Sequence, residues 1–124
     1  MKFERIILEN FRQYYGQERL EFAKDDQRRV TVIHGVNGAG KTSLFLAINW
    51  CLYGEGADNV GELISKEAVK LASPGETVIM LVELSFLHDG ERYLVKRSRR
   101  GTRMLNGSIQ TNSSDEFILS LIHI

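Results

Sequence analysis

The motif G-x-x-x-x-G-K-[ST] constrains this chain more than any other feature of its sequence. It is formed without deviation by Gly35, Val36, Asn37, Gly38, Ala39, Gly40, Lys41 and Thr42. The β-branched run before it, residues 30–34 (VTVIH), is typical of a buried central strand. Residues 42–53 follow with apolar side chains at helical spacing. Because a strand, a glycine-rich loop and a helix are the setting that this motif requires, the sequence predicts a phosphate-binding P-loop at 35–42.

Each residue type in the motif has its own physical role. Glycines at 35, 38 and 40 let the loop curl so that backbone N–H groups point at phosphate oxygens, and the helix N-terminus adds partial positive charge. Lys41 is expected to reach the β- and γ-phosphates, and the Thr42 hydroxyl to ligate a bridging Mg²⁺. Ser43 is a candidate for a further phosphate contact. The expected ligands are ATP and Mg²⁺; the alternative is a glycine-rich turn with an exposed lysine.

Hydrolysis requires groups that this sequence does not supply in recognisable form. A Walker-B type carboxylate should end a hydrophobic strand. Glu83 instead lies inside a predicted strand, and Asp115-Glu116 follow a polar stretch. We therefore identify no catalytic residue, and ATP hydrolysis by this chain alone is uncertain.

The remaining elements are expected to be mostly antiparallel strands. Asp89-Gly90 provides the positive φ of a tight turn between strands at 77–87 and 92–99. The other expectations are a strand pair at 3–9 and 18–22 around the polar stretch 10–17, a helix end at Gly54, a loop at 55–61 and a short helix at 62–72. Cys51 and His34 are interpreted as packed residues rather than reactive ones.

Composition predicts one soluble domain without disulfides. The chain has 124 residues, of which 43% are hydrophobic, and its 16 basic side chains balance 16 acidic ones. One cysteine, a charged N-terminus and the lack of any run of roughly 18 apolar residues favour a cytoplasmic setting without membrane spans.

The chain divides at about residue 100. Residues 1–100 hold the elements above, whereas 101–124 are polar and turn-rich, with at most a weak strand near Met104 or Ile109. We expect this tail to be disordered or truncated. Its last residues, 119–124 (LSLIHI), also resemble the translated read-through of a sequencing adapter, in which case they have no biological meaning.

Two stretches carry a resemblance to a known family. Residues 2–16 (KFERIILENFRQYYG) and 30–54 (VTVIHGVNGAGKTSLFLAINWCLYG) resemble the N-terminal lobe of the SMC-like ATPases, the chromosome-maintenance and double-strand-break-repair group that includes RecF-type proteins. The likeness covers most of residues 1–100. Within the group, Asn37, the pair Trp50-Cys51 and the helix end Leu52-Tyr53-Gly54 are most similar to DNA sulfur-modification (Dnd) and related phage-defence ATPases.

The resemblance implies a fold and partners. It implies an ABC-type ATPase head whose two lobes are separated by a coiled coil, with this chain as the first lobe. The family's signature motif, Walker B, D-loop and switch histidine lie in the second lobe, so none maps onto a residue here. Arg12 would lie near the nucleotide, the alternative being a solvated turn arginine. Two heads would sandwich two ATP molecules as a homodimer acting on DNA, and a lone first lobe should bind ATP weakly and hardly turn it over.

A basic cluster occupies the second strand of the predicted hairpin. Its members are Arg92, Lys96, Arg97, Arg99, Arg100 and Arg103. They are interpreted either as contacts to a DNA backbone or as the charged surface of an edge strand that prevents edge-to-edge pairing. Alternation places Lys96 on one face of the strand and Arg97 and Arg99 on the other.

The fold class expected is therefore α/β: a P-loop NTPase, the N-terminal lobe of an ABC-type ATPase head, with an antiparallel β arm. The function expected is ATP binding in a DNA repair, modification or defence ATPase. Two alternatives remain. One is another P-loop enzyme such as a kinase or GTPase, although the guanine-reading Asn-Lys-x-Asp does not occur. The other is a DNA-binding module without an ATPase cycle.

Overall fold

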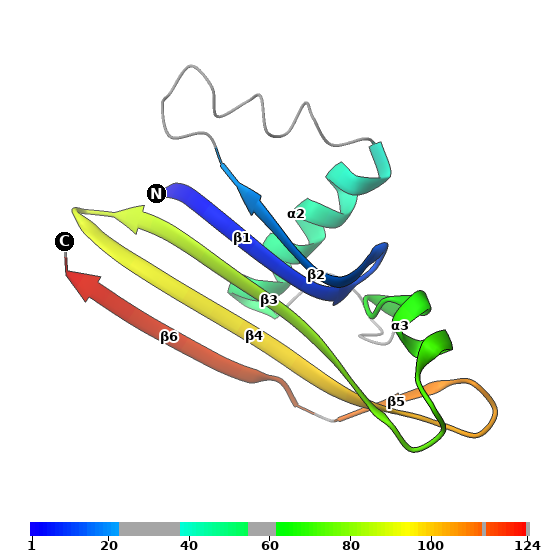
Figure 1. The fold of residues 1–124 in the computed structure, drawn as a ribbon. Helices are drawn as coiled ribbons and strands as arrows, with labels where there is room; N and C mark the ends of the chain where they lie inside the picture. The colour runs from blue at the N-terminus through cyan, green and yellow to red at the C-terminus, as the bar shows by residue number, and fades with distance from the viewer. Residues whose placement is uncertain (23–37, 55–61, 113, 124) are drawn as a thin grey trace.

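The computed structural model describes residues 1–22, 38–54, 62–112 and 114–123, and within them a single antiparallel sheet with two helices (Figure 1). Its elements are β1 (Lys2–Phe11), β2 (Tyr14–Glu21), α2 (Gly38–Tyr53), α3 (Lys66–Leu71), β3 (Thr77–His88), β4 (Glu91–Arg103), β5 (Ile109–Thr111) and β6 (Glu116–His123). The strand order is β2-β1-β3-β4-β5, and β6 also pairs with β4. The strand and loop expected at 30–34 and 55–61 lie outside the described residues.

The β3–β4 hairpin is the longest pairing in the sheet and confirms the turn expected at Asp89-Gly90. These two residues have φ of 51° and 76°, the successive positive values of a type I′ turn. The register continues from the pair His88–Glu91 to the pair Thr77–Thr102, beyond the ends expected from the sequence. Because the right-handed twist of this turn matches that of the strands, both strands continue without interruption.

The β1–β2 pair is confirmed, but its turn is shorter than the expected loop at 10–17. Strand β1 continues to Phe11, and β2 begins at Tyr14. Asn10 and Arg12 take positive φ of 52° and 50°, and the register shifts between Glu9 and Phe11. The polar residues therefore form an irregular tight turn rather than an open loop.

Both helices begin at residues other than those expected. Helix α2 begins at Gly38 instead of residue 42, so two of the motif glycines lie in its first turn rather than in a loop. Helix α3 begins at Lys66 instead of 62, because the Ser65 hydroxyl caps it by accepting from the Ala68 N–H at 3.2 Å. The expected end of α2 is confirmed: Gly54 has φ of 73°, and its N–H donates to the Trp50 carbonyl at 2.8 Å.

The core lies between α2 and one face of the sheet. The apolar side of α2 is formed by Leu44, Ala47, Trp50 and Cys51, all buried. It packs on alternate residues of the central strands: Ile6, Leu8, Met80, Val82, Leu84 and Val95. The rings of Phe11 and Trp50 lie 6.1 Å apart, at the end of this core nearest the β1–β2 turn. This packing fixes the position of α2, and with it the position of the P-loop lysine.

Strand β4 is an interior strand of the described sheet, since β3 lies on one side and β5 and β6 lie on the other (Figure 1). The interpretation of its cations as an edge-strand device is therefore wrong. Beyond residue 100, the end of β4 and the strands β5 and β6 continue the same sheet, where the sequence indicated at most one weak strand. The division of the chain into domains stays a prediction.

Candidate functional site

The first turn of α2 holds the described part of the P-loop motif. Lys41 is partly buried and Thr42 is exposed. The turn contains no acidic residue, so no carboxylate of its own competes for the positive end of this 16-residue helix. Gly35, Val36 and Asn37 lie outside the described residues. An ammonium group, a hydroxyl and helix N–H groups without a neighbouring carboxylate fit a magnesium-bound triphosphate.

The β1–β2 turn lies against this first turn of α2. The Tyr14 hydroxyl donates to the Gly40 carbonyl at 3.4 Å. The Ser43 hydroxyl donates to the side-chain oxygen of Gln13. Partial burial, and secondarily the charge of Glu18, raises the pKa of Tyr14, which keeps its hydroxyl protonated as a donor. Residues far apart in the sequence are thus joined at the N-terminus of the helix.

These contacts bring the turn that carries Arg12 beside the motif. The Arg12 backbone N–H donates to the Leu63 carbonyl at 2.7 Å, and its side chain is partly exposed. A direct role of Arg12 in nucleotide binding stays a prediction. Sequence reasoning missed Gln13 and Tyr14, for which the only available indication was their place next to Arg12.

Ser43, expected as a further phosphate contact, is completely buried. Its hydroxyl is directed to Gln13, so in this structure it joins α2 to the β1–β2 turn. A phosphate contact by Ser43 stays a prediction that would require this hydrogen bond to be exchanged.

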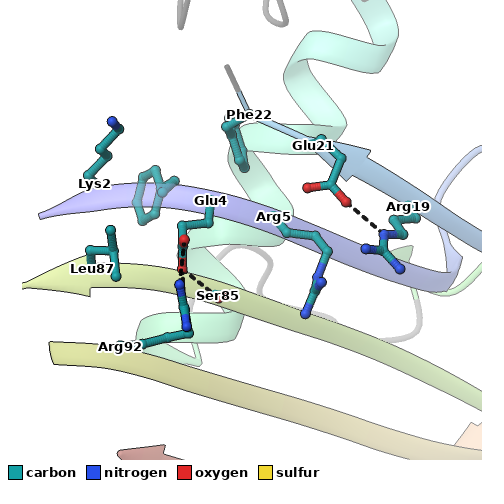
Figure 2. A pocket seen from close by; sticks show the side chains of 10 residues that line it. Lys2, Glu4, Arg5, Arg19, Glu21, Phe22, Ser85, Leu87 and Arg92 are labelled. Carbon is teal, nitrogen blue, oxygen red and sulfur yellow. Dashed lines mark hydrogen bonds and ion pairs between the residues drawn. The ribbon is translucent and has the colours of Figure 1, made fainter. Parts of the chain in front are cut away.

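One member of the basic cluster is paired on the sheet face opposite α2. Arg92 donates to both carboxylate oxygens of Glu4, at 2.8 and 3.2 Å, and the Ser85 hydroxyl donates to the same carboxylate at 3.2 Å (Figure 2). The hydrogen bond from Arg92 lowers the pKa of Glu4 below its ordinary value, although burial opposes the shift. A groove of about 630 Å³ surrounds this pair and is also lined by Lys2, Arg5, Arg19 and Glu21.

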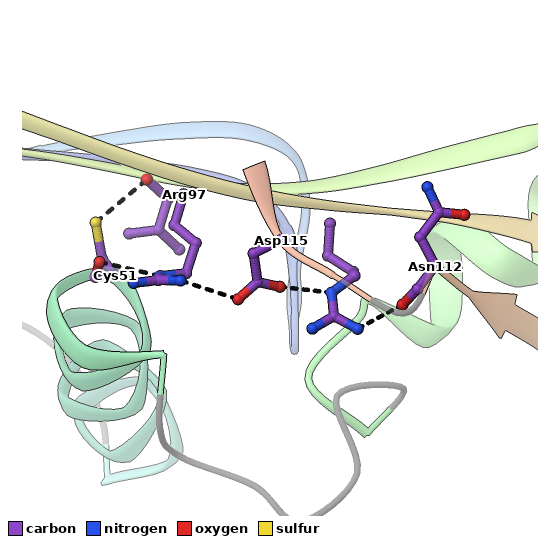
Figure 3. A network of polar contacts seen from close by, with 6 residues as sticks. Cys51, Arg97, Asn112 and Asp115 are labelled. Atoms are coloured by element: carbon purple, nitrogen blue, oxygen red, sulfur yellow. Dashed lines mark hydrogen bonds and ion pairs between the residues drawn. The ribbon is translucent and has the colours of Figure 1, made fainter. Parts of the chain in front are cut away.

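Two further members are paired on the face that α2 covers. Arg97 and Arg99 donate to the two oxygens of Asp115, at 3.0 and 2.5 Å. Arg97 also donates to the Cys51 carbonyl at 3.2 Å, at the end of α2 (Figure 3). These three charged side chains are 15%, 13% and 11% exposed, which marks them as internal ion pairs rather than surface contacts. Arg97 and Arg99 share a face, as alternation predicts.

The DNA hypothesis consequently depends on the other three cations. Lys96, Arg100 and Arg103 do not belong to the Glu4 and Asp115 networks. Arg103 lines a cavity of about 360 Å³ together with Lys66 and Lys70 of α3.

Two general searches of the described ranges found nothing. No helix in them is both long and apolar enough to cross a membrane. No group of three or more His, Cys, Asp or Glu side chains in the same ranges is arranged to hold a metal ion.

Comparison with known proteins gives a consistent set of similarities. A family model described as AAA domain matches residues 5–121. Arcadin-4 of Pyrobaculum calidifontis is 35% identical over 102 residues, which cover 82% of this chain and 12% of that protein. The DNA double-strand break repair Rad50 ATPase of Methanosarcina acetivorans is 35% identical over 103 residues, covering 81% of this chain and 8% of that protein. A component of the nuclease SbcCD of Vibrio cholerae is 30% identical over 95 residues, covering 75% and 9%. The chain thus spans about a tenth of the length of these relatives.

Proposed function

Because the chain belongs to the AAA domain family, in its SMC-like, double-strand-break-repair group, we propose that it is the ATP-binding N-terminal part of a DNA-associated ATPase. In this proposal a C-terminal lobe completes the site for hydrolysis. Closer kinship with the Dnd and phage-defence ATPases remains a prediction from the sequence.

One observation carries the proposal. Lys41 and Thr42 lie in the first turn of a helix that has no acidic residue there, and the Arg12-bearing turn is hydrogen-bonded to that same turn. A lysine in a merely glycine-rich surface turn would need none of these contacts. The combination is suited to an anion with several phosphate oxygens.

The residues of the motif would divide the ligand between them. Lys41 would donate to the β- and γ-phosphates, and the Thr42 hydroxyl would hold Mg²⁺, which when bound neutralises charge on these phosphates. Residues 35–40 would contribute backbone N–H groups, and Arg12 would approach from the β1–β2 turn. The positive φ of Arg12 is consistent with a functional position, since strained backbone occurs often at ligand sites.

DNA and a second copy of the head are the partners proposed for the whole protein. The names of two relatives refer to DNA double-strand break repair and to a nuclease. On this chain, the backbone phosphates of DNA would be contacted by Lys96, Arg100 and Arg103. Head-to-head dimerisation would place each P-loop opposite the signature motif of the partner head.

ATP binding by the chain with and without Lys41 tests the proposal. We expect wild type to bind ATP in the presence of Mg²⁺, and Lys41→Ala to weaken binding about ten- to hundredfold, since a charge-assisted hydrogen bond contributes roughly 1.5–3 kcal/mol. Lys66→Ala, which removes an exposed lysine at the start of α3, is the matched control and should bind like wild type. Equal affinity of Lys41→Ala and wild type, measured by calorimetry, would overturn the proposal.

The same assay separates the two alternatives. A preference for GTP over ATP would favour another class of P-loop enzyme. Duplex DNA binding that changes neither with ATP nor with Lys41→Ala would favour a passive DNA-binding module.

A further inference from the structure

Asn10, at the end of β1, connects three neighbouring segments. Its side-chain amide donates to the Ile79 carbonyl of β3 at 2.9 Å, and its side-chain oxygen accepts from the Gly16 N–H of β2 at 2.9 Å. Its backbone carbonyl accepts from the Ser65 N–H at 2.8 Å, just before α3. Both halves of one short amide are thus used, and by different strands.

The backbone of Asn10 also determines the direction of the chain. Its φ of 52° is sterically unfavourable for most residues and tolerated by asparagine. Two residues later Arg12 repeats a positive φ, and the intervening Phe11 is fully buried and forms a bridge to Ile64. The route from Asn10 to Arg12 is therefore fixed at every residue.

The far side of the same turn is joined to α2. Gln13 and Tyr14 accept from Ser43 and donate to Gly40, respectively. The turn is consequently held on one side by the sheet and on the other by the helix that carries Lys41. A small rotation at Asn10 would move Arg12 relative to Lys41.

We propose that Asn10 is a positioning residue for the nucleotide site: it holds the β1–β2 turn so that Arg12 points at the phosphates bound by Lys41. This inference rests on the proposed function. Its effect on ATP binding is exerted through Arg12, and Asn10 itself does not contact the ligand.

The chemistry of the position gives two complementary variants. Asn10→Asp keeps the shape and the acceptor for Gly16, but sets a carboxylate oxygen against the Ile79 carbonyl, where a donor is needed. Asn10→Gly keeps the positive φ and removes both side-chain hydrogen bonds. The first perturbs the connection to β3 selectively, and the second tests whether the backbone conformation alone suffices.

A double-mutant cycle distinguishes positioning from general stabilisation. ATP affinity is measured by fluorescence of a labelled ATP analogue for wild type, Asn10→Asp, Arg12→Ala and the double variant, at a urea-free condition where denaturation curves show each to be folded. We expect Arg12→Ala to weaken binding about tenfold and Asn10→Asp several-fold. In the Arg12→Ala background, Asn10→Asp should change the affinity less than twofold.

The possible contrary results have different meanings. If Asn10→Asp weakens binding by the same factor in both backgrounds, or if either single variant binds like wild type, the positioning role is overturned while the Lys41 result still supports the proposed function. If wild type binds no ATP, or binds it independently of Lys41, the proposed function and this inference both fail. Should Asn10→Asp not fold, the same cycle with Asn10→Gly decides.

Discussion

At the scale of single residues, the surroundings of Cys51 determine whether its thiol can react. The side chain is fully buried, and its sulfur lies 3.4 Å from the Val82 carbonyl and 3.5 Å from the Val95 carbonyl. Loss of solvation on burial raises the pKa of Cys51 to about 12. Because the thiolate is the reactive form, the folded chain at pH 8 holds this residue neutral as well as inaccessible.

We therefore expect Cys51 in the folded chain to react with Ellman's reagent at least a hundredfold more slowly than in urea. Ser73→Cys adds a thiol at an exposed position and should contribute one fast-reacting group to the folded chain. Rapid reaction of wild type without urea would show that the core between α2 and the sheet opens readily.

Glu4 should make the stability of the fold depend on acid. Its pKa is lowered from 4.5 chiefly by the hydrogen bond from Arg92, so the pair contributes stability above pH 4.5 and loses it as pH falls through the lower folded-state value. Glu4→Gln should lower the free energy of unfolding at pH 7 and make little difference at pH 3, as measured by urea denaturation.

Glu21→Gln is the control for this experiment. Glu21 and its partner Arg19 are 53% and 58% exposed, so water screens their attraction and the change should be small at both values of pH. A difference between wild type and Glu4→Gln that is equally large at pH 3 would contradict the assignment to the Arg92 pair.

At the scale of the elements, the end of α2 combines a glycine and an arginine. Gly54 has the positive φ of a helix C-terminal glycine, and a Cβ placed there would lie 3.3 Å from the guanidinium of Arg97. That guanidinium donates to the last turn of α2 and pairs with Asp115. The glycine thus serves the backbone and leaves room for the arginine.

Gly54→Ala should lower the free energy of unfolding by more than Gly75→Ala. Gly75 also has positive φ, 85°, but open space at its Cβ position, so its substitution measures the backbone cost alone, about 1 kcal/mol. The additional loss at Gly54 reports displacement of Arg97. Equal losses in chemical denaturation would mean that Arg97 adjusts without cost.

Local sequence was sufficient where a pattern is local. Asp89-Gly90 predicted its hairpin and Gly54 predicted the end of α2, because turn and cap conformations depend on adjacent residues. The start of α3 was not predictable, since it depends on residues 62–65 pairing with Phe11. The same applies to Asp115, whose partners Arg97 and Arg99 come from another strand. The P-loop was recognisable from the sequence, whereas the contact of Gln13 and Tyr14 with α2 was not.

At the scale of the whole molecule, binding and turnover of ATP should separate. Lys41 and Thr42 belong to this chain, but none of the motifs that complete hydrolysis in the SMC-like group maps onto its residues. We expect phosphate release by wild type to equal that of Lys41→Ala, although only wild type binds ATP. Release that depends on Lys41 would show that the chain contains a hydrolytic group not identified from its sequence.

The pairing of β1 with β3 has a kinetic consequence. Ile6 lies opposite Leu84, so the sheet encloses a long stretch of chain that includes all of α2 and its lysine. Contacts between residues so distant in sequence form slowly during folding. A nucleotide can dock only after this closure, and it should therefore lengthen the lifetime of the folded chain without accelerating its formation.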